Sequence, residues 1–293
     1  MSNEKLHASA DVWTRFAPAF SKAMTSQSNA TGPAVAPNKA MLAALHALRP
    51  LSSATTIHDV GSGPGQVTSL LLDGYAAQLP AGATVVASDS SAGMVEQVRA
   101  RKASELAAGN ADWERVSTAL LDVRHLATIA DDSVSHVTAG FLFFLTPDPR
   151  AGLVEVRRVL TTQAGGGALA LSSWLRADWL DATVEVLSTV SPTMTLPRMP
   201  ANWDSVEGVR GEMQAAGFRH VQTAPVDTYW DYETPAKMVA ALIAMPLLQV
   251  VIRDMSEGDR ARVEGLMQEW LRAKNGDGKG RLLGVAITGV GRK

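Results

Sequence analysis

One stretch of the chain decides its fold: Ile57-His58-Asp59-Val60-Gly61-Ser62-Gly63-Pro64-Gly65-Gln66-Val67-Thr68. Three glycines stand at alternate positions in it, between an apolar run and an amphipathic one. Glycine suits a tight turn that needs positive φ angles, and its missing side chain leaves a ligand room against the backbone. The stretch therefore predicts a β-strand that leads into an α-helix through a ligand-binding turn.

The spacing of these glycines bears on which ligand the turn takes. A dinucleotide-binding turn has the spacing Gly-x-Gly-x-x-Gly, in which the last glycine lets the helix approach the strand beneath a pyrophosphate. Counted from Gly61, that last place falls on Gln66, and counted from Gly63 it falls on Thr68. The spacing therefore does not predict a pyrophosphate site, and a glycine-rich turn without a ligand stays as the alternative.

A second strand is predicted at 83–89, where β-branched residues precede an acid, with a helix from about Ala92 onward. Asp89 then lies at the carboxyl edge of a parallel sheet, which is the edge where open α/β sheets bind ligands. A carboxylate at this point can accept hydrogen bonds from both hydroxyls of a ribose. The competing interpretation of Asp89 is an acid that caps the following helix.

The remaining pattern predicts an open sheet with helices between its strands. Strands are expected at 119–123, within the run 134–145, at 168–174, after Gly217 and at 282–290, and helices at 11–24, 38–48, 149–160, 205–216, 234–245 and 256–274. Pro18 is expected to kink or split the first of these helices. Residues 31–37 have the composition of a linker and hinge, and 191–200 form an irregular, proline-rich segment.

Taken in order, the motifs from about Ala40 to Trp174 resemble those of the class I S-adenosylmethionine-dependent methyltransferases. The resemblance implies an α/β, Rossmann-like fold: a seven-stranded, mostly parallel sheet with an antiparallel last strand and a helical cap. It implies S-adenosyl-L-methionine as the cofactor. Three parts are expected: 1–37 as an N-terminal helical lid and linker, 38–174 as the cofactor-binding core, and 175–293 as the rest of the sheet with an inserted helical substrate cap.

The same resemblance implies roles for single residues around the cofactor. Asp59-x-Gly61-x-Gly63-x-Gly65 is similar to the first motif of the family, and Asp89-Ser90-Ser91-Ala92-Gly93-Met94 is similar to its Asp-x-Ser-x-x-Met. The implied cofactor-binding residues are Asp59, Gly61, Ser62, Gly63 and Gly65 for the amino-acid end, Asp89 and Ser90 for the ribose, Met94, Asp122 and Val123 for the adenine, and Ala139, Gly140 and Phe141 beside the methionine moiety. Core packing of Met94 and a loop position for Asp122 stay as alternatives.

Aromatic residues predict the acceptor pocket. Trp13, Phe16 and Phe20 recur at spacings of three and four on one helix, and Phe144 and Trp174 lie at the ends of the fourth and fifth strands. In related enzymes an N-terminal helix of this kind closes over the cofactor, although the aromatic stripe could equally pack onto the main domain. The helices inserted between the last two strands would contribute to a lid over an apolar substrate, with oligomerisation as the competing use.

The sequence assigns no catalytic base. No convincing Lys-Glu or His-Asp pair falls at the predicted strand ends, and His136 and Asp148 are the two remaining candidates. Methyl transfer from a sulfonium requires the reactants to be aligned, and it requires a base only when the nucleophile is protonated at the working pH. A thiol, with a pKa of about 8.5, is already partly ionised near neutrality. The missing base therefore favours an acidic or thiol-like acceptor.

Nearly the full chain resembles fungal secondary-metabolite methyltransferases, especially the gliotoxin-type S-methyltransferases. The residues that carry this finer resemblance are the aromatic N-terminal helix, Asp89 to Met94, Ser172-Ser173-Trp174, Asn202-Trp203-Asp204-Ser205 and Ala216-Gly217-Phe218. It implies methyl transfer to a small, largely apolar natural product, with a thiol of a secondary metabolite as one acceptor. O- or N-methylation of a polyketide, phenol or amine stays open. A cyclisation or pericyclic step without methyl transfer, and a regulatory binding module, are the interpretations from other classes.

Composition narrows the remaining possibilities. The 293 residues carry a formal net charge of -2, which gives no net attraction for nucleic acid. No apolar segment approaches the roughly 18 to 20 residues of a membrane span, and residues 1–10 lack the apolar core of a signal peptide. A cytoplasmic protein with a small-molecule substrate is therefore expected, with no nucleic-acid or membrane partner and an oligomeric state that stays unknown. The absence of cysteine and the scattered positions of the six histidines predict no metal site.

Overall fold

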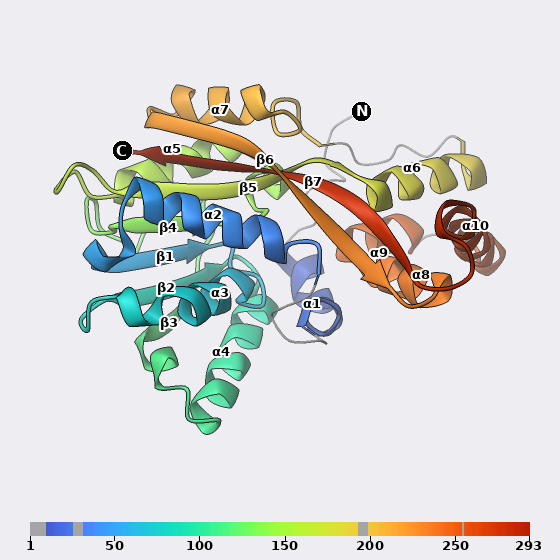
Figure 1. Cartoon of the computed structure of the whole chain (residues 1–293), viewed down its shortest axis with the longest axis horizontal. Helices are drawn as coiled ribbons and strands as arrows, with labels where there is room; N and C mark the ends of the chain where they lie inside the picture. Colours follow the sequence, from blue (N-terminus) through green and yellow to red (C-terminus); the bar gives the residue numbers. More distant parts are fainter. Residues whose placement is uncertain (1–9, 26–31, 193–198, 254) are drawn as a thin grey trace.

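A single seven-stranded sheet in the order β3-β2-β1-β4-β5-β7-β6 forms the centre of the computed structural model (Figure 1), which describes residues 10–25, 32–192, 199–253 and 255–293. The strands are β1 (Thr56–Val60), β2 (Thr84–Asp89), β3 (Val116–Leu120), β4 (His136–Ala139), β5 (Ala168–Ala177), β6 (Arg219–Tyr232) and β7 (Gly280–Arg292). The first five strands pair in parallel, and β7 is antiparallel to both of its neighbours. The predicted fold class is confirmed.

Three strand boundaries differ from those expected. The third strand ends at Leu120, so that Asp122 and Val123 lie in the turn beyond it. Of the run 134–145 only His136–Ala139 is strand, because the chain turns at Phe141, which has a φ of 54°, and then forms the short helix η5 (Phe143–Leu145). The fifth strand continues past Trp174 to Ala177, because it pairs along its whole length with β7.

Helices cover both faces of the sheet, as its apolar strands require. One face is covered by α2 (Val35–Leu48), α3 (Gln66–Tyr75) and α4 (Ala92–Ala107), and the other by α5 (Pro149–Val159) and α7 (Val206–Ala215). Side chains of β5 alternate between these layers: Ala168 and Ala170 face the first core, Leu169 and Leu171 the second. Apolar side chains of the helices and of the strands therefore form two cores, one on each face of the sheet.

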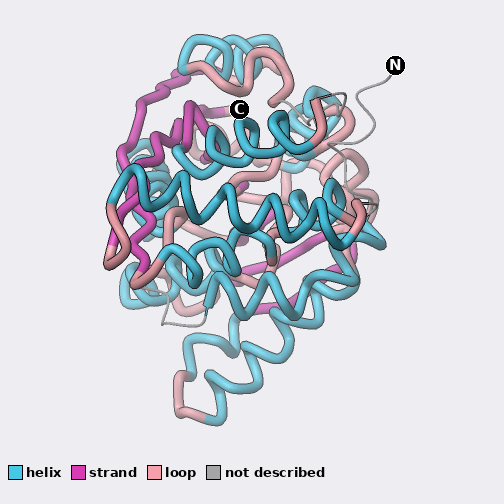
Figure 2. Tube along the Cα trace, turned by 90° about the vertical axis from the view of Figure 1, so that its right-hand side faces the viewer, coloured by secondary structure: helices cyan, strands magenta, loops and turns pink. Residues whose placement is uncertain are grey.

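A third core lies beyond the carboxyl end of β5, where four helices gather on the right of Figure 1. They are α6 (Asp178–Val190), α8 (Pro235–Ile243), α9 (Pro246–Ile252) and α10 (Glu257–Asn275). Viewed from this end, the molecule presents mainly helices in front of its strands (Figure 2). The expected helix at 234–245 ends at Ile243, and α9 was not predicted; it begins at Pro246, a residue that starts helices readily but cannot continue one.

The N-terminal helix α1 (Ala10–Thr25) runs through Pro18 as one element and is not split there. It packs against α4 and α9. The following helix begins at Val35, so the second half of the expected linker 31–37 belongs to α2, and Thr31 lies outside the described residues. The hydroxyl of Thr228 on β6 donates to the Pro33 carbonyl at 2.8 Å and holds the entry to α2 against the sheet.

Two of the expected part boundaries cut elements. The boundary between 37 and 38 falls inside α2, and that between 174 and 175 falls inside β5. Boundaries before Val35 and after Ala177 would cut neither α2 nor β5. The division into lid, core and cap otherwise stays a prediction, and the irregular segment expected at 191–200 lies mostly outside the described residues, at 193–198.

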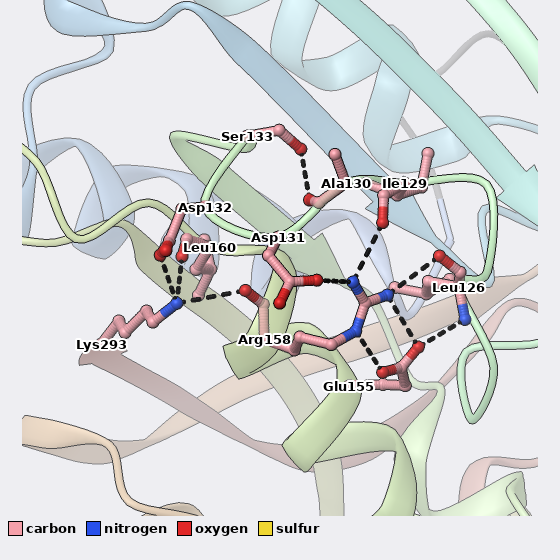
Figure 3. A network of polar contacts seen from close by, with 10 residues as sticks. All are labelled: Leu126, Ile129, Ala130, Asp131, Asp132, Ser133, Glu155, Arg158, Leu160 and Lys293. Atoms are coloured by element: carbon pink, nitrogen blue, oxygen red, sulfur yellow. Dashed lines mark hydrogen bonds and ion pairs between the residues drawn. The ribbon is translucent and has the colours of Figure 1, made fainter.

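A polar network lies at the edge of the sheet where the parallel strands begin. There the turn before β4 meets the C-terminus (Figure 3). Arg158 at the end of α5 pairs with Glu155 at 2.6 Å and with Asp131, and it also donates to backbone carbonyls in the 126–129 turn. The Lys293 ammonium pairs with Asp132 at 2.6 Å and donates to the carbonyl oxygens of residues 158 and 160. These contacts hold the amino ends of the strands, away from the glycine turn. Within the described ranges, no helix is both long and apolar enough to cross a membrane.

Candidate active site

The glycine turn joins β1 to α3, as the sequence predicts. Gly61, Gly63 and Gly65 have φ angles of 60°, 53° and 83°, in the left-handed region that residues with a Cβ rarely adopt. The Ser62 N–H donates to the Ser88 carbonyl at 2.9 Å, which fixes the turn beside the end of β2. The backbone conformation therefore explains why all three positions are glycine.

Two of these glycines also differ in what surrounds them. A Cβ on Gly61 would overlap the side chain of Leu142, which follows β4 and packs onto the turn. A Cβ on Gly63 would meet nothing within 4 Å. The turn is thus packed at Gly61 and open at Gly63, and the open side offers room for a ligand.

Asp89 lies at the end of β2, directly beside the open side of the turn. Its carboxylate accepts hydrogen bonds from the Gly63 N–H at 3.0 Å and from the Ser91 N–H at 2.9 Å. Burial raises the pKa of this carboxyl group, and the backbone N–H donors of Ser91, Gly63 and Ser90 act in the opposite direction. A carboxylate has about four acceptor positions, so lone pairs remain for a ligand hydroxyl.

Asp59 lies beneath the turn and not on its open side. The side chain is fully buried, with one oxygen accepting from the Thr68 N–H at 3.1 Å and hydroxyl at 2.7 Å, and the other from the Thr138 hydroxyl at 2.9 Å. Alternation along β1 directs it toward α3. Asp59 thus ties β1, α3 and β4 together below the turn, and its expected contact with the cofactor stays a prediction.

The environment of Asp59 gives a testable dependence on pH. Burial raises its pKa from 3.8 to about 6, in spite of the hydrogen bonds from Thr68 and Thr138 that lower it. The folded state then binds more protons than the unfolded state between these two values, so the stabilising contribution of Asp59 is lost as the pH rises through about 6. In Asp59→Asn the amide oxygen can accept from Thr68 and the amide nitrogen can donate to the Thr138 hydroxyl.

We therefore expect the free energy of unfolding of Asp59→Asn, minus that of the unsubstituted protein, to rise by a few kcal/mol between about pH 4 and pH 7. Urea unfolding at each pH measures it. Burial lowers the pKa of His58 and of His136 to about 4, which acts in the opposite direction over the same window. These histidines are present in both proteins, so their effect cancels in the difference. A difference that does not change with pH would contradict the argument.

The exit of β3 reaches the same edge. The Leu121 N–H donates to the Asp89 carbonyl at 3.0 Å, which places the turn containing Asp122 beside the end of β2. Arg124 binds the Asp122 carboxylate, with its closest contact at 2.6 Å, and this hydrogen bond lowers the pKa of Asp122. Val123 is buried in the core under α5. The structure thus brings Asp122 to the edge but engages its carboxylate with Arg124, while the Val123 side chain points into the core.

Met94 and Ser91 begin α4 at this edge. Met94 is almost completely buried, and its N–H donates to the Ser91 hydroxyl, which caps the helix, at 3.2 Å. The Ser91 hydroxyl also lies 3.0 Å from that of Thr14 on α1. A Cβ on Gly93 would lie 2.6 Å from the Thr14 carbonyl oxygen, so α1 packs directly on the N-terminus of α4. The predicted lid helix therefore lies beside Asp89, and its closing function stays a prediction.

The segment after β4 completes the edge. Ala139 is buried at the end of the strand, and a Cβ on Gly140 would lie 2.7 Å from Val67. Phe141 has a φ of 54°, a strained value for a residue with a side chain. Its N–H donates to the Ser172 hydroxyl at 3.0 Å, and its ring stacks on Trp174 with 4.4 Å between the ring centroids. These two contacts hold the strained residue in place.

Aromatic rings extend from this point into the cap. The Trp174 ring meets that of Trp179 edge-on at 5.1 Å, and Trp179 meets Trp230 at 5.5 Å. Together with Phe141 they form a row of four rings, here named the aromatic row. Of the predicted acceptor residues, Trp174 belongs to this row.

The other predicted acceptor residues lie elsewhere. Phe144 is buried at 6% exposure within the core on the α5 face of the sheet. Trp13 and Phe20 pack edge-on against each other on α1, with their ring centroids 5.7 Å apart, and Phe16 on the same helix is half-buried. The three aromatics Trp13, Phe16 and Phe20 thus lie on the N-terminal helix α1, while Phe144 belongs to the core.

Neither candidate base lies at the open side of the turn. His136 is the first residue of β4, so it stands at the opposite edge of the sheet, fully buried between the Ser135 hydroxyl at 2.9 Å and the Arg49 carbonyl at 3.2 Å. Burial lowers its pKa to about 4. The Asp148 carboxylate caps α5 and accepts from the Ala151 N–H at 2.9 Å. His136 is therefore too far from the turn for direct proton transfer there. The Asp148 carboxylate has a structural contact, as the cap of α5.

Several site residues were not predicted. Asn38 on α2, Gln66 at the start of α3 and Ser172 on β5 are buried beside the turn and hydrogen-bond to one another. The signal available was a polar residue within an otherwise apolar element. In the described residues, the buried atoms without a hydrogen-bond partner include the Ser62 hydroxyl in the turn and the Gln66 amide nitrogen at the first residue of α3.

The described ranges contain no group of three His, Cys, Asp or Glu side chains that could hold a metal ion. Two surface hollows lie away from the turn. One of about 330 Å³ lies between α4 and β3, lined by residues that include Lys102, Leu106 and Val116. The other, of about 270 Å³, lies in the cap and includes Gln249 and Glu264 in its lining. The site is therefore defined by the turn and its polar atoms and not by these hollows.

Comparison with known proteins gives the same class as this geometry. Residues 58–170 match the family described as a methyltransferase domain. The chain is 33% identical over 287 residues to Methyltransferase ucsB of an Acremonium species, covering 96% of this chain and 95% of that protein. Methyltransferase tpcH of Aspergillus fumigatus is 27% identical over 250 residues, covering 81% of this chain and 84% of its own length.

Solved structures share the fold at low sequence identity. The YcgJ protein of Bacillus subtilis has a TM-score of 0.53 at 14% identity, covering 87% of this chain and 98% of that chain. Phosphoethanolamine N-methyltransferase 2 of Haemonchus contortus, solved in complex with S-adenosyl-L-methionine, has a TM-score of 0.52 at 14% identity, covering 94% of this chain and 56% of that chain. The chain thus shares its fold with known structures.

The fold and site define a class I methyltransferase, with the carboxyl edge of the sheet as its cofactor edge. The chain belongs to the S-adenosylmethionine-dependent methyltransferases and is an enzyme of that family. S-adenosyl-L-methionine is its cofactor, and the residues present fit it. Gly63 leaves open space, Asp89 keeps free acceptor positions beside that space, and two buried polar atoms, in the turn and at the first residue of α3, have no partner within the described residues.

Proposed function

We propose that this enzyme methylates a small, largely apolar secondary metabolite, bound between the cofactor edge and the helical cap. The aromatic row carries the proposal. It begins at Phe141, beside the glycine turn, and continues through Trp174 and Trp179 to Trp230. Stacked aromatic side chains provide large apolar area with a preferred geometry for a flat, apolar molecule.

The chain's own residues would bind and align the reactants. S-adenosyl-L-methionine supplies a methyl group on a sulfonium, which moves to the acceptor by in-line displacement. Asp89 is proposed to accept the ribose hydroxyls, and the positive φ angles of the turn bring backbone N–H groups close to the ligand. The lid helix α1 and the cap would exclude water, so that alignment supplies most of the rate enhancement.

The acceptor is proposed to be a thiol or another group that ionises readily. Support comes from the two candidate bases, since His136 lies at the opposite edge and the Asp148 carboxylate caps α5. A thiol with a pKa of about 8.5 is partly ionised near neutrality and needs little assistance from a base. An acidic phenol or enol needs some assistance to lose its proton, and an alcohol needs a strong base.

Methylation assays test the proposal. The enzyme is incubated with S-adenosyl-L-methionine and matched dithiols, phenols and amines, and the products are examined by mass spectrometry. We expect a mass gain of about 14 Da on dithiols or acidic phenols. Trp174→Leu should lower kcat/KM for the acceptor by at least about tenfold, by loss of aromatic stacking and contact area, and leave the Kd of S-adenosylhomocysteine within about twofold.

Tyr229→Ala, at an exposed aromatic residue on β6, is the matched control and should leave both values unchanged. Methylation of amines alone would replace the thiol assignment by N-methylation. A transformed substrate without any gain in mass would favour a cyclisation. Equal loss of cofactor and acceptor binding in Trp174→Leu would assign Trp174 to the support of the cofactor site.

A further inference from the structure

The strand β5 binds Phe141 at two points. The Phe141 N–H donates to the Ser172 hydroxyl at 3.0 Å, and the Phe141 ring stacks on that of Trp174 with 4.4 Å between the ring centroids. Ser172 and Trp174 are two positions apart on the strand, so their side chains leave it on the same face. One face of β5 therefore fixes both the backbone and the ring of Phe141.

This arrangement begins where the ladder between β4 and β5 ends. The last pair of the ladder is Ala139 with Leu171, and beyond it Phe141 has a φ of 54°. A residue with a Cβ rarely adopts this conformation, which persists only where its surroundings hold it. Because the Phe141 N–H donates to a side chain, a single substitution can remove this hold and leave the strand pairing as it is.

A second hydrogen bond orients the Ser172 hydroxyl. Its oxygen accepts from the Phe141 N–H, so its own proton is available to the Asn38 Oδ1 on α2, at 3.3 Å. Ser172 and Asn38 are both buried, so water does not compete for these bonds. The hydroxyl is thus held in one orientation, with a lone pair directed at Phe141.

We propose that Ser172 is a positioning residue for the acceptor. By holding Phe141 in its left-handed conformation, the hydroxyl keeps the Phe141 ring on Trp174 and sets the end of the aromatic row that lies beside the glycine turn. A flat acceptor that stacks on the row is then aligned for in-line displacement. The inference rests on the proposed function, in which the acceptor binds along this row.

Two thiol probes separate alignment from general damage. 2-Naphthalenethiol is flat and aromatic and can stack on the row, whereas dithiothreitol is a small dithiol without a ring. With S-adenosyl-L-methionine as the donor, Ser172→Ala is expected to lower kcat/KM for 2-naphthalenethiol by about tenfold or more and to leave that for dithiothreitol within about twofold. The Kd of S-adenosylhomocysteine should stay within about threefold, because the turn and Asp89 keep their own hydrogen bonds.

Ser173→Ala is the matched control. Ser173 is the next residue of β5 and is also buried, but its hydroxyl donates to the Trp203 carbonyl at 2.6 Å, on the other face of the strand. This variant loses a buried hydroxyl from the same strand without releasing Phe141, so both kcat/KM values should stay within about twofold. Thermal unfolding of each variant establishes that it is folded at the temperature of the assay.

A double-mutant cycle with Phe141→Leu tests whether Ser172 acts through Phe141. The leucine removes the ring, so Ser172→Ala in this background should lower kcat/KM for 2-naphthalenethiol by no more than about a further twofold. Losses that multiply would assign Ser172 to the general support of β5 and overturn the proposal. Equal losses for the two thiol probes in Ser172→Ala would overturn it as well.

Hydrogen exchange tests the hold on Phe141 without any ligand. Mass spectrometry follows the peptide that contains the Phe141 N–H, which should exchange about tenfold faster or more in Ser172→Ala and at an unchanged rate in Ser173→Ala. An unchanged rate in Ser172→Ala would mean that the hydroxyl does not hold Phe141. No methylation of either thiol by the unsubstituted enzyme would instead contradict the proposed function and, with it, the role of Ser172 toward an acceptor.

Discussion

Replacing Gly63 by valine is expected to lower the affinity for S-adenosylhomocysteine by more than about a hundredfold and to leave the protein folded. Gly63 has a φ of 53°, and a Cβ there would enter space with no atom within 4 Å. A branched side chain would fill this space and press the backbone out of the left-handed region, which disfavours β-branched residues most. It would also displace the N–H that binds Asp89 at 3.0 Å.

Gly109→Val is the matched control for this change. Gly109 has a φ of 86°, and its Cβ position is likewise open, but it follows the far end of α4. Valine at position 109 strains a backbone with a positive φ angle, as it does at position 63, but it lies away from the cofactor edge. The Kd of this control for S-adenosylhomocysteine should therefore equal that of the unsubstituted protein. Calorimetry gives the affinities, and circular dichroism with thermal unfolding reports the fold. If Gly63→Val binds within tenfold, the open space in front of Gly63 is not where the cofactor lies.

Asp89→Ala is expected to weaken the cofactor by one to two orders of magnitude, about 1.4 to 2.7 kcal/mol, through the loss of charge-assisted hydrogen bonds to the ribose. The ribose is present in both S-adenosylhomocysteine and 5′-methylthioadenosine, so the Kd of each should rise by the same factor. Asp89 also binds the N–H groups of Gly63 and Ser91, and part of the loss will come from the freed turn.

Asp112→Ala, at a half-buried acid of η4 (Ala111–Arg115) that pairs with Arg115, serves as the control, with no expected change in either Kd. Because burial raises the pKa of Asp89, the cofactor affinity of the unsubstituted protein should fall as the pH drops through that raised pKa, and Asp89→Ala should remove this dependence. Unchanged affinity in Asp89→Ala would remove the residue from the site.

Local sequence patterns predicted the glycine turn and the position of Asp89 at the end of its strand. The alternate glycines predicted a strand, a turn and a helix, and the acid after a β-branched run placed Asp89 at the carboxyl edge. The helices predicted at 205–216, 234–245 and 256–274 also form, and the hydroxyls of Ser205, Thr234 and Ser256 cap them, because a hydroxyl before an amphipathic run is a local signal. Such features depend on residues that are neighbours in sequence.

The remainder depends on contacts between distant residues. Asp59 has the spacing of a ligand-binding acid, but its partner Thr138 on β4 is 79 positions away and draws it beneath the turn. Ser172 and Asn38 are 134 positions apart, and no local pattern indicates that they are hydrogen-bonded. The apolar run 134–145 predicted a strand around His136, but only the short length of β4 shows that His136 is its first residue.

The chain leaves the sheet at Tyr232, forms the cap helices α8, α9 and α10, and returns to the sheet at Gly280. Tyr232 and Gly280 are direct partners in the antiparallel pairing of β6 with β7. Partners in an antiparallel ladder have Cα atoms about 5 Å apart, a gap that a turn of two residues can close. No strand pairing therefore depends on how long the segment 233–279 is or on what it contains. Insertions, deletions or wholesale exchange of this segment can remodel the chamber above the cofactor edge while every strand keeps its register. Diversification of the acceptor chamber and retention of the sheet are, in this architecture, separate problems for evolution and for engineering.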